Sequence, residues 1–270
     1  MSSDLSYCGQ LVQEHDPDRF LLSMFAPAER REALWALFAF NHEIAKTREV
    51  VTETQLGLIR LQWWRDAIAA LYGDETERGV PEHEVAGALV VAIKDHDLPR
   101  EHFDALIYAR EFDLEDVLPG NLEGTINYAD FTATPLMKLA VQICGGDAEV
   151  EPVQPVAVNY ALAGILRAVR THAMQRRCYL PQDLVSKHGV KLNQLYELKP
   201  QDGLSAITQS VADEFTAGVQ TDIAFLKASQ ALAGIYIRQI KRLGGDVFHS
   251  KMQVQPAFKA FRLLLGVRFG

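Results

Sequence analysis

The sequence predicts an all-α fold, and three observations support this. Apolar residues recur at three- and four-residue spacing through most of the 270 residues. No alternating, β-branched run is long enough to predict a strand, and the breaks between periodic segments are short. With 48% apolar and 23% charged residues, the chain can bury one large core. We therefore expect a single domain over residues 1–270, built from about ten helices.

The first strongly periodic segment starts at Pro27, since proline in the first turn followed by Glu29 is typical of a helix start. Its apolar spacing continues to Val51 and predicts one helix over residues 27–51. A second helix is expected over Glu53–Tyr72, where Gly73 provides a stop.

The rest of the chain repeats this organisation. Helices are expected over Glu82–Asp95, Pro99–Leu118, Tyr128–Cys144, Val153–His172, Ser205–Ala228 and Ala231–Leu243, with a loop over Leu180–Gly189. Residues 257–268 form a basic amphipathic segment, which fits a helix on a membrane surface or the last helix of the bundle with its cations in water.

Composition excludes several classes of protein. A formal charge of −8 and a pI near 5.5 argue against a nucleic-acid-binding surface, and we expect no nucleic-acid partner. The three cysteines form no CxxC pair and are expected to be reduced thiols. Residues 1–18 resemble neither a secretory signal nor a transit peptide, and no apolar stretch reaches the length of a membrane span. We expect a cytoplasmic protein, with the basic segment allowing a peripheral place at the inner membrane.

Common enzyme motifs are missing from the sequence. It contains no GxxxxGK[ST], GxGxxG or GxSxG pattern. His42-Glu43 and His83-Glu84 each begin like a helical zinc motif, but neither has the second histidine four residues on.

A basic run lies in the second half of this acidic chain. It comprises Arg167, Arg170, Arg176 and Arg177, together with His172. Arginine forks suit phosphate oxygens, so the run fits an anion site; a solvated or salt-bridged surface is the alternative. In the same way, the acidic group Asp113, Glu115 and Asp116 fits a solvated helix face or a lone metal contact.

Several separated segments, in one order, resemble the squalene/phytoene synthase family. They are Ala26–Arg31, Ala39–Asn41, the Leu61-Gln62-Trp63-Trp64 stretch, Gly164–His172 and Arg176–Asp183. The resemblance implies an isoprenoid synthase-type helical bundle with a central cavity. Enzymes of this family join two prenyl diphosphates head to head, using Mg²⁺ held between two aspartate-rich clusters.

The resemblance also identifies which positions should carry those aspartates. Here they are occupied by Ala45, Lys46 and Glu49 in the first cluster and by Ala168 and His172 in the second. A lysine beside a Mg²⁺ site opposes metal binding. The metal clamp is therefore degenerate by this comparison, and we expect no cofactor.

One branch of the family lacks the aspartates in the same way: the mitochondrial complex I assembly factors and their bacterial relatives. Ala39–Ala45, Ile59–Arg65 and Arg177–Asp183 resemble that branch. The resemblance implies a pseudoenzyme that binds complex I subunits, a membrane surface, or an isoprenoid or lipid anion. Its candidate ligand-binding residues are Lys46, Arg167, Arg170, His172, Arg176 and Arg177. Its candidate remnants of the cavity mouth are Asn41, His42, Glu49 and Asp113.

Two alternatives remain open. One is an active head-to-head prenyltransferase, dependent on Mg²⁺, whose metal site is rebuilt from Glu49, Asp113, Glu115 and Asp116. The other is a carrier or sensor that holds a lipid in the cavity without converting it.

Overall fold

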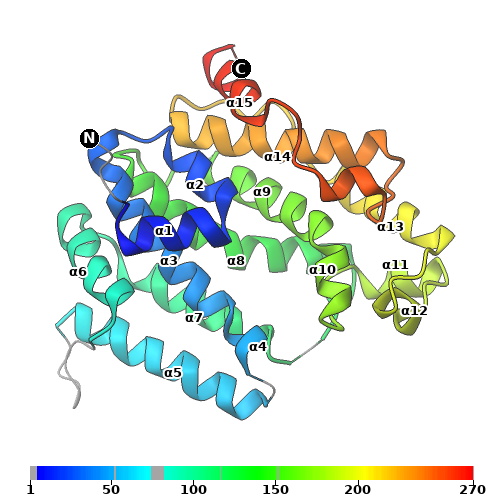
Figure 1. Cartoon of the computed structure of the whole chain (residues 1–270), viewed down its shortest axis with the longest axis horizontal. Helices are drawn as coiled ribbons and strands as arrows, with labels where there is room; N and C mark the ends of the chain where they lie inside the picture. Colours follow the sequence, from blue (N-terminus) through cyan, green and yellow to red (C-terminus); the bar gives the residue numbers. More distant parts are fainter. Residues whose placement is uncertain (1–4, 52, 74–81, 116, 151, 270) are drawn as a thin grey trace. The chain divides into compact units, whose positions relative to one another are not determined.

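A computed structural model of the chain describes residues 5–51, 53–73, 82–115, 117–150 and 152–269 (Figure 1). In these ranges it contains helices and no strand, which confirms the all-α prediction. The first eight helices are α1 Tyr7–His15, α2 Pro17–Ser23, α3 Arg31–Ala45, α4 Thr47–Val50, α5 Thr54–Leu71, α6 Glu84–His96, α7 Arg100–Phe112 and α8 Leu122–Ile143. The others are α9 Val153–Arg167, α10 Val169–Met174, α11 Gln182–Lys187, α12 Leu192–Tyr196, α13 Asp202–Asp213, α14 Ala224–Arg242 and α15 Lys259–Phe269. Two 3-10 helices cover Ala28–Arg30 and Ser250–Gln253.

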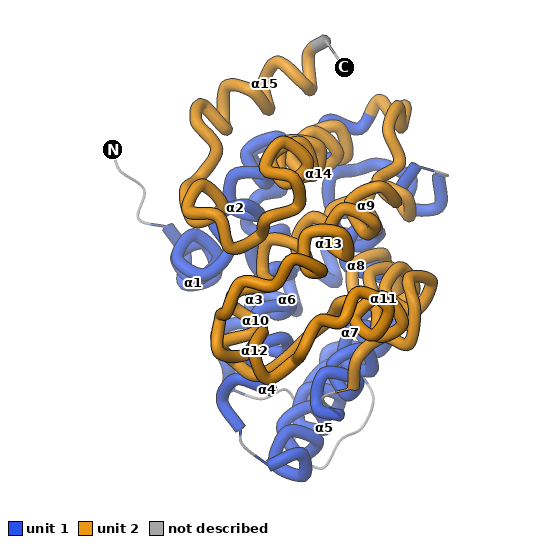
Figure 2. Tube along the Cα trace, turned by 90° about the vertical axis from the view of Figure 1, so that its right-hand side faces the viewer, with its two compact units in different colours: residues 1–115, 135–153, 223–225 blue, residues 116–134, 154–222, 226–270 orange. Residues whose placement is uncertain are grey.

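The chain divides into two compact units, coloured in Figure 2. Unit 1 comprises residues 1–115, 135–153 and 223–225, and unit 2 comprises residues 116–134, 154–222 and 226–270. The single-domain organisation and the central cavity stay predictions.

The core of unit 1 is built from large side chains on α3, α5 and α7. Phe40 packs edge-on against Trp64 and Phe103, with ring centroids 5.3 and 5.4 Å apart. All three side chains are almost completely buried. Edge-to-face packing of this kind stabilises aromatic pairs beyond the area that they bury. These ring contacts hold α3, α5 and α7 together, and polar residues of the same three helices form the candidate site.

In unit 2, polar contacts supplement apolar packing. The Asn159 side chain on α9 accepts from the Thr216 N–H at 3.0 Å and donates to the Thr216 carbonyl at 2.9 Å. Thr208 on α13 donates to the Gly245 carbonyl at 2.6 Å. The Gln182 and Asp183 N–H groups donate to the carbonyls of Pro119 and Gly120, at 2.8 and 3.1 Å.

The sequence predicts two helices, at 205–228 and 231–243, and the predicted position of the break between them is wrong. The structure instead has α13 ending at Asp213 and α14 running without a break from Ala224 to Arg242. The break lies where Asn159 binds both backbone groups of Thr216 and where Gly218 adopts a left-handed φ of 73°. Glycine tolerates that conformation and so allows the chain to leave the helix.

Other boundaries also differ. The predicted 27–51 helix is divided at Lys46 and the predicted 153–172 helix at Ala168. The helix expected from Tyr128 begins at Leu122, because the Asn121 side chain accepts from the Gly124 N–H at 2.8 Å. The helix expected to reach Leu118 ends at Phe112 in a turn, and the loop expected over 180–189 contains α11.

The described part of the chain contains more helices than expected. Fifteen α-helices are present, including α1 and α2, which the sequence analysis did not predict. Ser6 caps α1 by accepting from the Gly9 N–H at 3.1 Å. Asp16 caps α2 by accepting from the Arg19 N–H at 3.0 Å. None of the described helices is both long and apolar enough to cross a bilayer.

Candidate functional site

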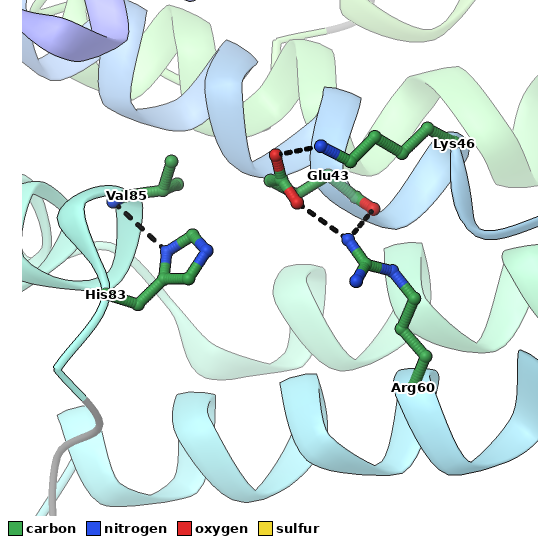
Figure 3. A network of polar contacts seen from close by, with 5 residues as sticks. All are labelled: Glu43, Lys46, Arg60, His83 and Val85. Atoms are coloured by element: carbon green, nitrogen blue, oxygen red, sulfur yellow. Dashed lines mark hydrogen bonds and ion pairs between the residues drawn. The ribbon is translucent and has the colours of Figure 1, made fainter. Parts of the chain in front are cut away.

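The end of α3 carries a buried carboxylate, that of Glu43, which contacts two cations. One carboxylate oxygen accepts from the Lys46 ammonium, one helical turn further on. The other oxygen accepts from the Arg60 guanidinium of α5 at 2.7 Å, and the same nitrogen lies 3.4 Å from the Glu43 backbone carbonyl (Figure 3). The Glu43 side chain is only 6% exposed, against 28% for Lys46 and 32% for Arg60. Both oxygens of this carboxylate are therefore occupied by positive groups that also reach water.

A second buried carboxylate follows α7. Arg110 lies 3.1 Å from Asp113 Oδ2 and donates to Asn41 Oδ1 at 3.3 Å. Asn41 and Asp113 are both buried. The guanidinium therefore connects two of the predicted remnants, Asn41 on α3 and Asp113 at the end of α7.

These contacts bear on whether unit 1 fits Mg²⁺. Hard cations bind carboxylate oxygens that are free to coordinate them. Here Lys46 and Arg60 occupy Glu43, and Arg110 occupies one oxygen of Asp113. Among the described residues, no group of three histidine, cysteine or acidic side chains could hold a metal ion. The donor set does not fit Mg²⁺ without displacement of these basic groups.

His42, another predicted remnant, is half-buried on α3. Its ring stacks on that of His15 on α1, with centroids 4.6 Å apart and planes 12° from parallel. Burial lowers the pKa of His42, and the charges of His15 and Lys46 lower it further. This environment favours the neutral imidazole. Glu49, on α4, is exposed.

Two further residues of unit 1, Trp64 on α5 and His83 before α6, are in contact with each other. Trp64 is almost completely buried. Its ring contacts His83 edge-on at 5.1 Å. His83 accepts from the Val85 N–H at 3.2 Å and so caps α6 (Figure 3). His83 therefore has a capping role in this structure.

The basic run lies in unit 2 and is divided between two helices and a turn. Arg167 ends α9, and its guanidinium lies 3.6 Å from the ring centroid of Tyr236 on α14. Arg176, just after α10, has a left-handed φ of 58° and lies over the ring of Tyr196 on α12 at 5.5 Å. Such cation–π contacts hold each guanidinium against an aromatic ring.

The remaining members of the run surround the turn after α10. The His172 ring packs edge-on against Tyr179 at 4.7 Å, and Tyr179 stacks on Tyr128 at 4.9 Å. The small pocket lined by His172, Arg177 and Tyr179 has no room for a water molecule. Arg170 is half-buried on α10. The expectation that Arg167 and Arg170 share one continuous helix is wrong, because the helix is divided at Ala168.

Lys46 lies in unit 1 and the basic run in unit 2, so their joint action as an anion site stays a prediction. Sequence reasoning missed the partners in unit 1, Arg60 and Arg110. The Arg110–Asp113 spacing of three residues is a recognisable helical ion-pair signal. The Arg60–Glu43 contact joins two different helices, so the spacing of these residues in the sequence does not indicate it.

The sequence model of the squalene/phytoene synthase family matches residues 12–257, so the chain belongs to this family. It is 27% identical, over 92% of its length and 77% of the relative's, to human "NADH dehydrogenase (ubiquinone) complex I, assembly factor 6". It is 28% identical to the phytoene synthase of Thermus thermophilus, over 89% of this chain and 83% of the relative. A dehydrosqualene synthase crystal structure superposes with a TM-score of 0.75, covering 97% of this chain and 94% of that one at 20% identity. This similarity confirms the isoprenoid synthase fold.

Proposed function

We propose that this chain is a non-catalytic member of the squalene/phytoene synthase family that assists the assembly of respiratory complex I. The observation that carries the proposal is the occupation of Glu43 by Lys46 and Arg60. A buried carboxylate held by two basic side chains is a poor ligand for the Mg²⁺ that prenyl transfer by this family's chemistry needs. The similarity to human complex I assembly factor 6 over most of the chain supports the assembly role.

The proposed binding partner is a complex I subunit or an isoprenoid or lipid anion. Arginine forks match carboxylate and phosphate oxygens, and Lys46 adds a point charge. The residues proposed to contact this partner are Lys46, Arg167, Arg170, His172, Arg176 and Arg177. We place the protein in the cytoplasm, at the surface of the inner membrane, without a metal cofactor and without a nucleic-acid partner.

A head-to-head prenyltransferase is the second candidate function, and the similarity to a phytoene synthase favours it. Its metal site would draw on Glu49, Asp113, Glu115 and Asp116. Glu49 and Glu115 are exposed, and Asp113 is paired with Arg110. Asp116 lies outside the described residues. This candidate needs Asp113 to exchange its arginine for a metal ion.

Complementation of a strain that lacks the gene tests the assembly role. Membranes of the deletion strain should lose NADH:quinone oxidoreductase activity, and the wild-type gene should restore it. The Glu49→Ala variant should restore it equally well, since an exposed glutamate of a non-catalytic protein holds no metal. Full activity in membranes of the deletion strain would contradict the assembly role.

A direct assay tests the enzymatic alternative. Purified protein is incubated with farnesyl or geranylgeranyl diphosphate, with and without Mg²⁺ and NADPH, and released diphosphate is measured. The Thermus thermophilus relative serves as the positive control. We expect no release above background. Mg²⁺-dependent release that Glu49→Ala abolishes would overturn the non-catalytic proposal.

A further inference from the structure

Positive charge is concentrated at the C-terminal end of unit 2. Residues 231–270 contain seven lysines and arginines and one acidic residue, Asp246, so their formal charge is +6. Residues 1–230 carry a formal charge of −14. The last forty residues are therefore a basic segment of an otherwise strongly acidic protein, and such a segment attracts anions.

Helix α15 packs with one face on α14. Leu263 is fully buried, and a Cβ atom added to Gly266 would lie 2.9 Å from the Cβ of Ala231 on α14. Residues 263 and 266 lie on the same side of a helix, so this side faces α14. The opposite side exposes apolar side chains to solvent, together with Arg268. Its exposed apolar side chains, with the residue just before the helix, are Phe258 (81%), Phe261 (60%), Leu264 (59%) and Leu265 (43%).

A pocket of about 320 Å³ is lined by residues of α14 and by Arg262 of α15, which follows Phe261 in the chain. Three cations from different elements line it: Arg242 at the end of α14, Lys251 in the second 3-10 helix, and Arg262 on α15. Gln239 donates to the Lys251 carbonyl at 2.8 Å and so fixes that wall. Among the residues that the structure describes, no acidic side chain lines the pocket. Burial lowers the pKa of nearby Arg238, and the charges of Arg262 and Arg242 lower it further, which is consistent with cations crowded together.

We propose that these residues form a docking surface for an anionic lipid bilayer. Phe258, Phe261, Leu264 and Leu265 enter the interfacial layer, and Arg242, Lys251 and Arg262 bind a lipid phosphate in the pocket. We call these seven residues the C-terminal surface. Exposed aromatic and leucine side chains flanked by cations are typical of helices that lie in the plane of a membrane interface.

Charge complementarity favours a bilayer over a second copy of the chain. A symmetric dimer buries the same surface on both subunits, so it would place the cations of one pocket close to those of the other. An anionic bilayer instead offers phosphates to the pocket and hydrocarbon to the apolar side chains. The inference deepens the membrane location proposed above and rests on it, but it does not need the assembly role.

Vesicle co-sedimentation with the purified full chain tests the docking surface. The protein should bind vesicles of equal parts phosphatidylcholine and phosphatidylglycerol, and bind phosphatidylcholine vesicles much more weakly. Each cation near an anionic surface contributes about fivefold to binding, so the variant R242Q/K251Q/R262Q should bind about a hundredfold more weakly. Phe261→Ser with Leu265→Ser should also lose binding, and added salt should weaken the binding of the wild type.

A charge-matched variant controls for net charge. Lys187, Lys191 and Lys199 are exposed in unit 2 and lie outside the C-terminal surface, so K187Q/K191Q/K199Q should bind like the wild type. Circular dichroism melting checks that all variants are folded. The proposal is overturned if the wild type binds neither kind of vesicle, or if the two triple variants lose binding equally. Vesicle binding by purified protein is independent of complex I activity in cells, so the two proposals can fail separately.

Discussion

The Glu43 contacts predict an energetic coupling that can be measured. Glu43 is buried and shares its two oxygens between Lys46 and Arg60. When only one of the two cations is removed, the Glu43 carboxylate still contacts the other. Removal of both leaves a buried carboxylate without a basic side chain in contact. Arg60→Met and Lys46→Met should therefore each be tolerated, while the double variant should be destabilised by more than the sum.

The size of the effect follows from the exposure of each group. A hydrogen bond to a charged group contributes about 1.5–3 kcal/mol. Because Lys46 and Arg60 are about 30% exposed, water screens them, and we expect about 1 kcal/mol for each single variant. An uncompensated buried charge costs about 3–5 kcal/mol, and we take the lower end, about 3 kcal/mol, for the double variant. The two substitutions should then be coupled by about 1 kcal/mol.

Urea unfolding followed by circular dichroism measures these free energies. Lys199→Met is the control, because Lys199 and its partner Glu197 are both largely exposed, and it should leave stability unchanged within the resolution of the assay. If the double variant costs no more than the two single variants added together, the two cations do not share one buried carboxylate, and the reasoning is refuted.

Three further predictions concern other groups. Because the pKa of His42 is lowered in the folded state, the unfolded chain takes up the His42 proton at a higher pH than the folded chain does. The free energy of unfolding should therefore fall as the pH drops from about 7 to about 5. His42→Gln should reduce that fall, as a series of melting temperatures at different pH values can show. Burial raises the pKa of the three thiols to about 11 for Cys8, about 12 for Cys144 and about 11 for Cys178. Iodoacetamide should therefore modify them at mildly alkaline pH only after unfolding, as intact-mass spectrometry can show. Asn159→Ala removes the side chain that binds both backbone groups of Thr216 and should cost about 2 kcal/mol in urea unfolding; an unchanged midpoint would contradict the role of Asn159 in ending α13.

The sequence predicts well those helices whose structure depends on their own residues. The predicted helix at 53–72 and the observed α5 differ by one residue at each end, because its apolar spacing and the glycine that follows are local signals. The 205–228 prediction fails for the opposite reason. The break after Asp213 depends on Asn159, more than fifty residues away in sequence, while the apolar spacing runs on through the break.

Local capping signals for α1 and α2 are also present in the sequence. Asp16 before Pro17 combines a capping side chain with proline at the first helical position, and Ser6 precedes α1 in the same way. These two caps predict the two N-terminal helices.

In the candidate site, too, contacts within one helix can be predicted from the sequence, and contacts between helices cannot. Lys46 and Glu43 lie three residues apart on one helical turn, so their pairing is readable from spacing. Arg60 and Arg110 come from α5 and α7 and meet α3 only in the folded chain. Spacing within one helix therefore identifies Lys46 as a positive group near the site. It cannot show that Arg60 of α5 pairs with Glu43, or that Arg110 of α7 reaches Asn41 on α3.

The stability test of Glu43 also separates the two candidate functions. A Mg²⁺ ion and the two cations require the same carboxylate oxygens, so a side chain that strongly prefers Lys46 and Arg60 is withheld from a metal. A large coupling in the double variant would mean that these cations stabilise the end of α3 in place of a metal, as the non-catalytic proposal requires. Without any coupling, Glu43 would be available for coordination at little cost. The prenyltransferase alternative would then gain a carboxylate that the sequence alone did not assign to it.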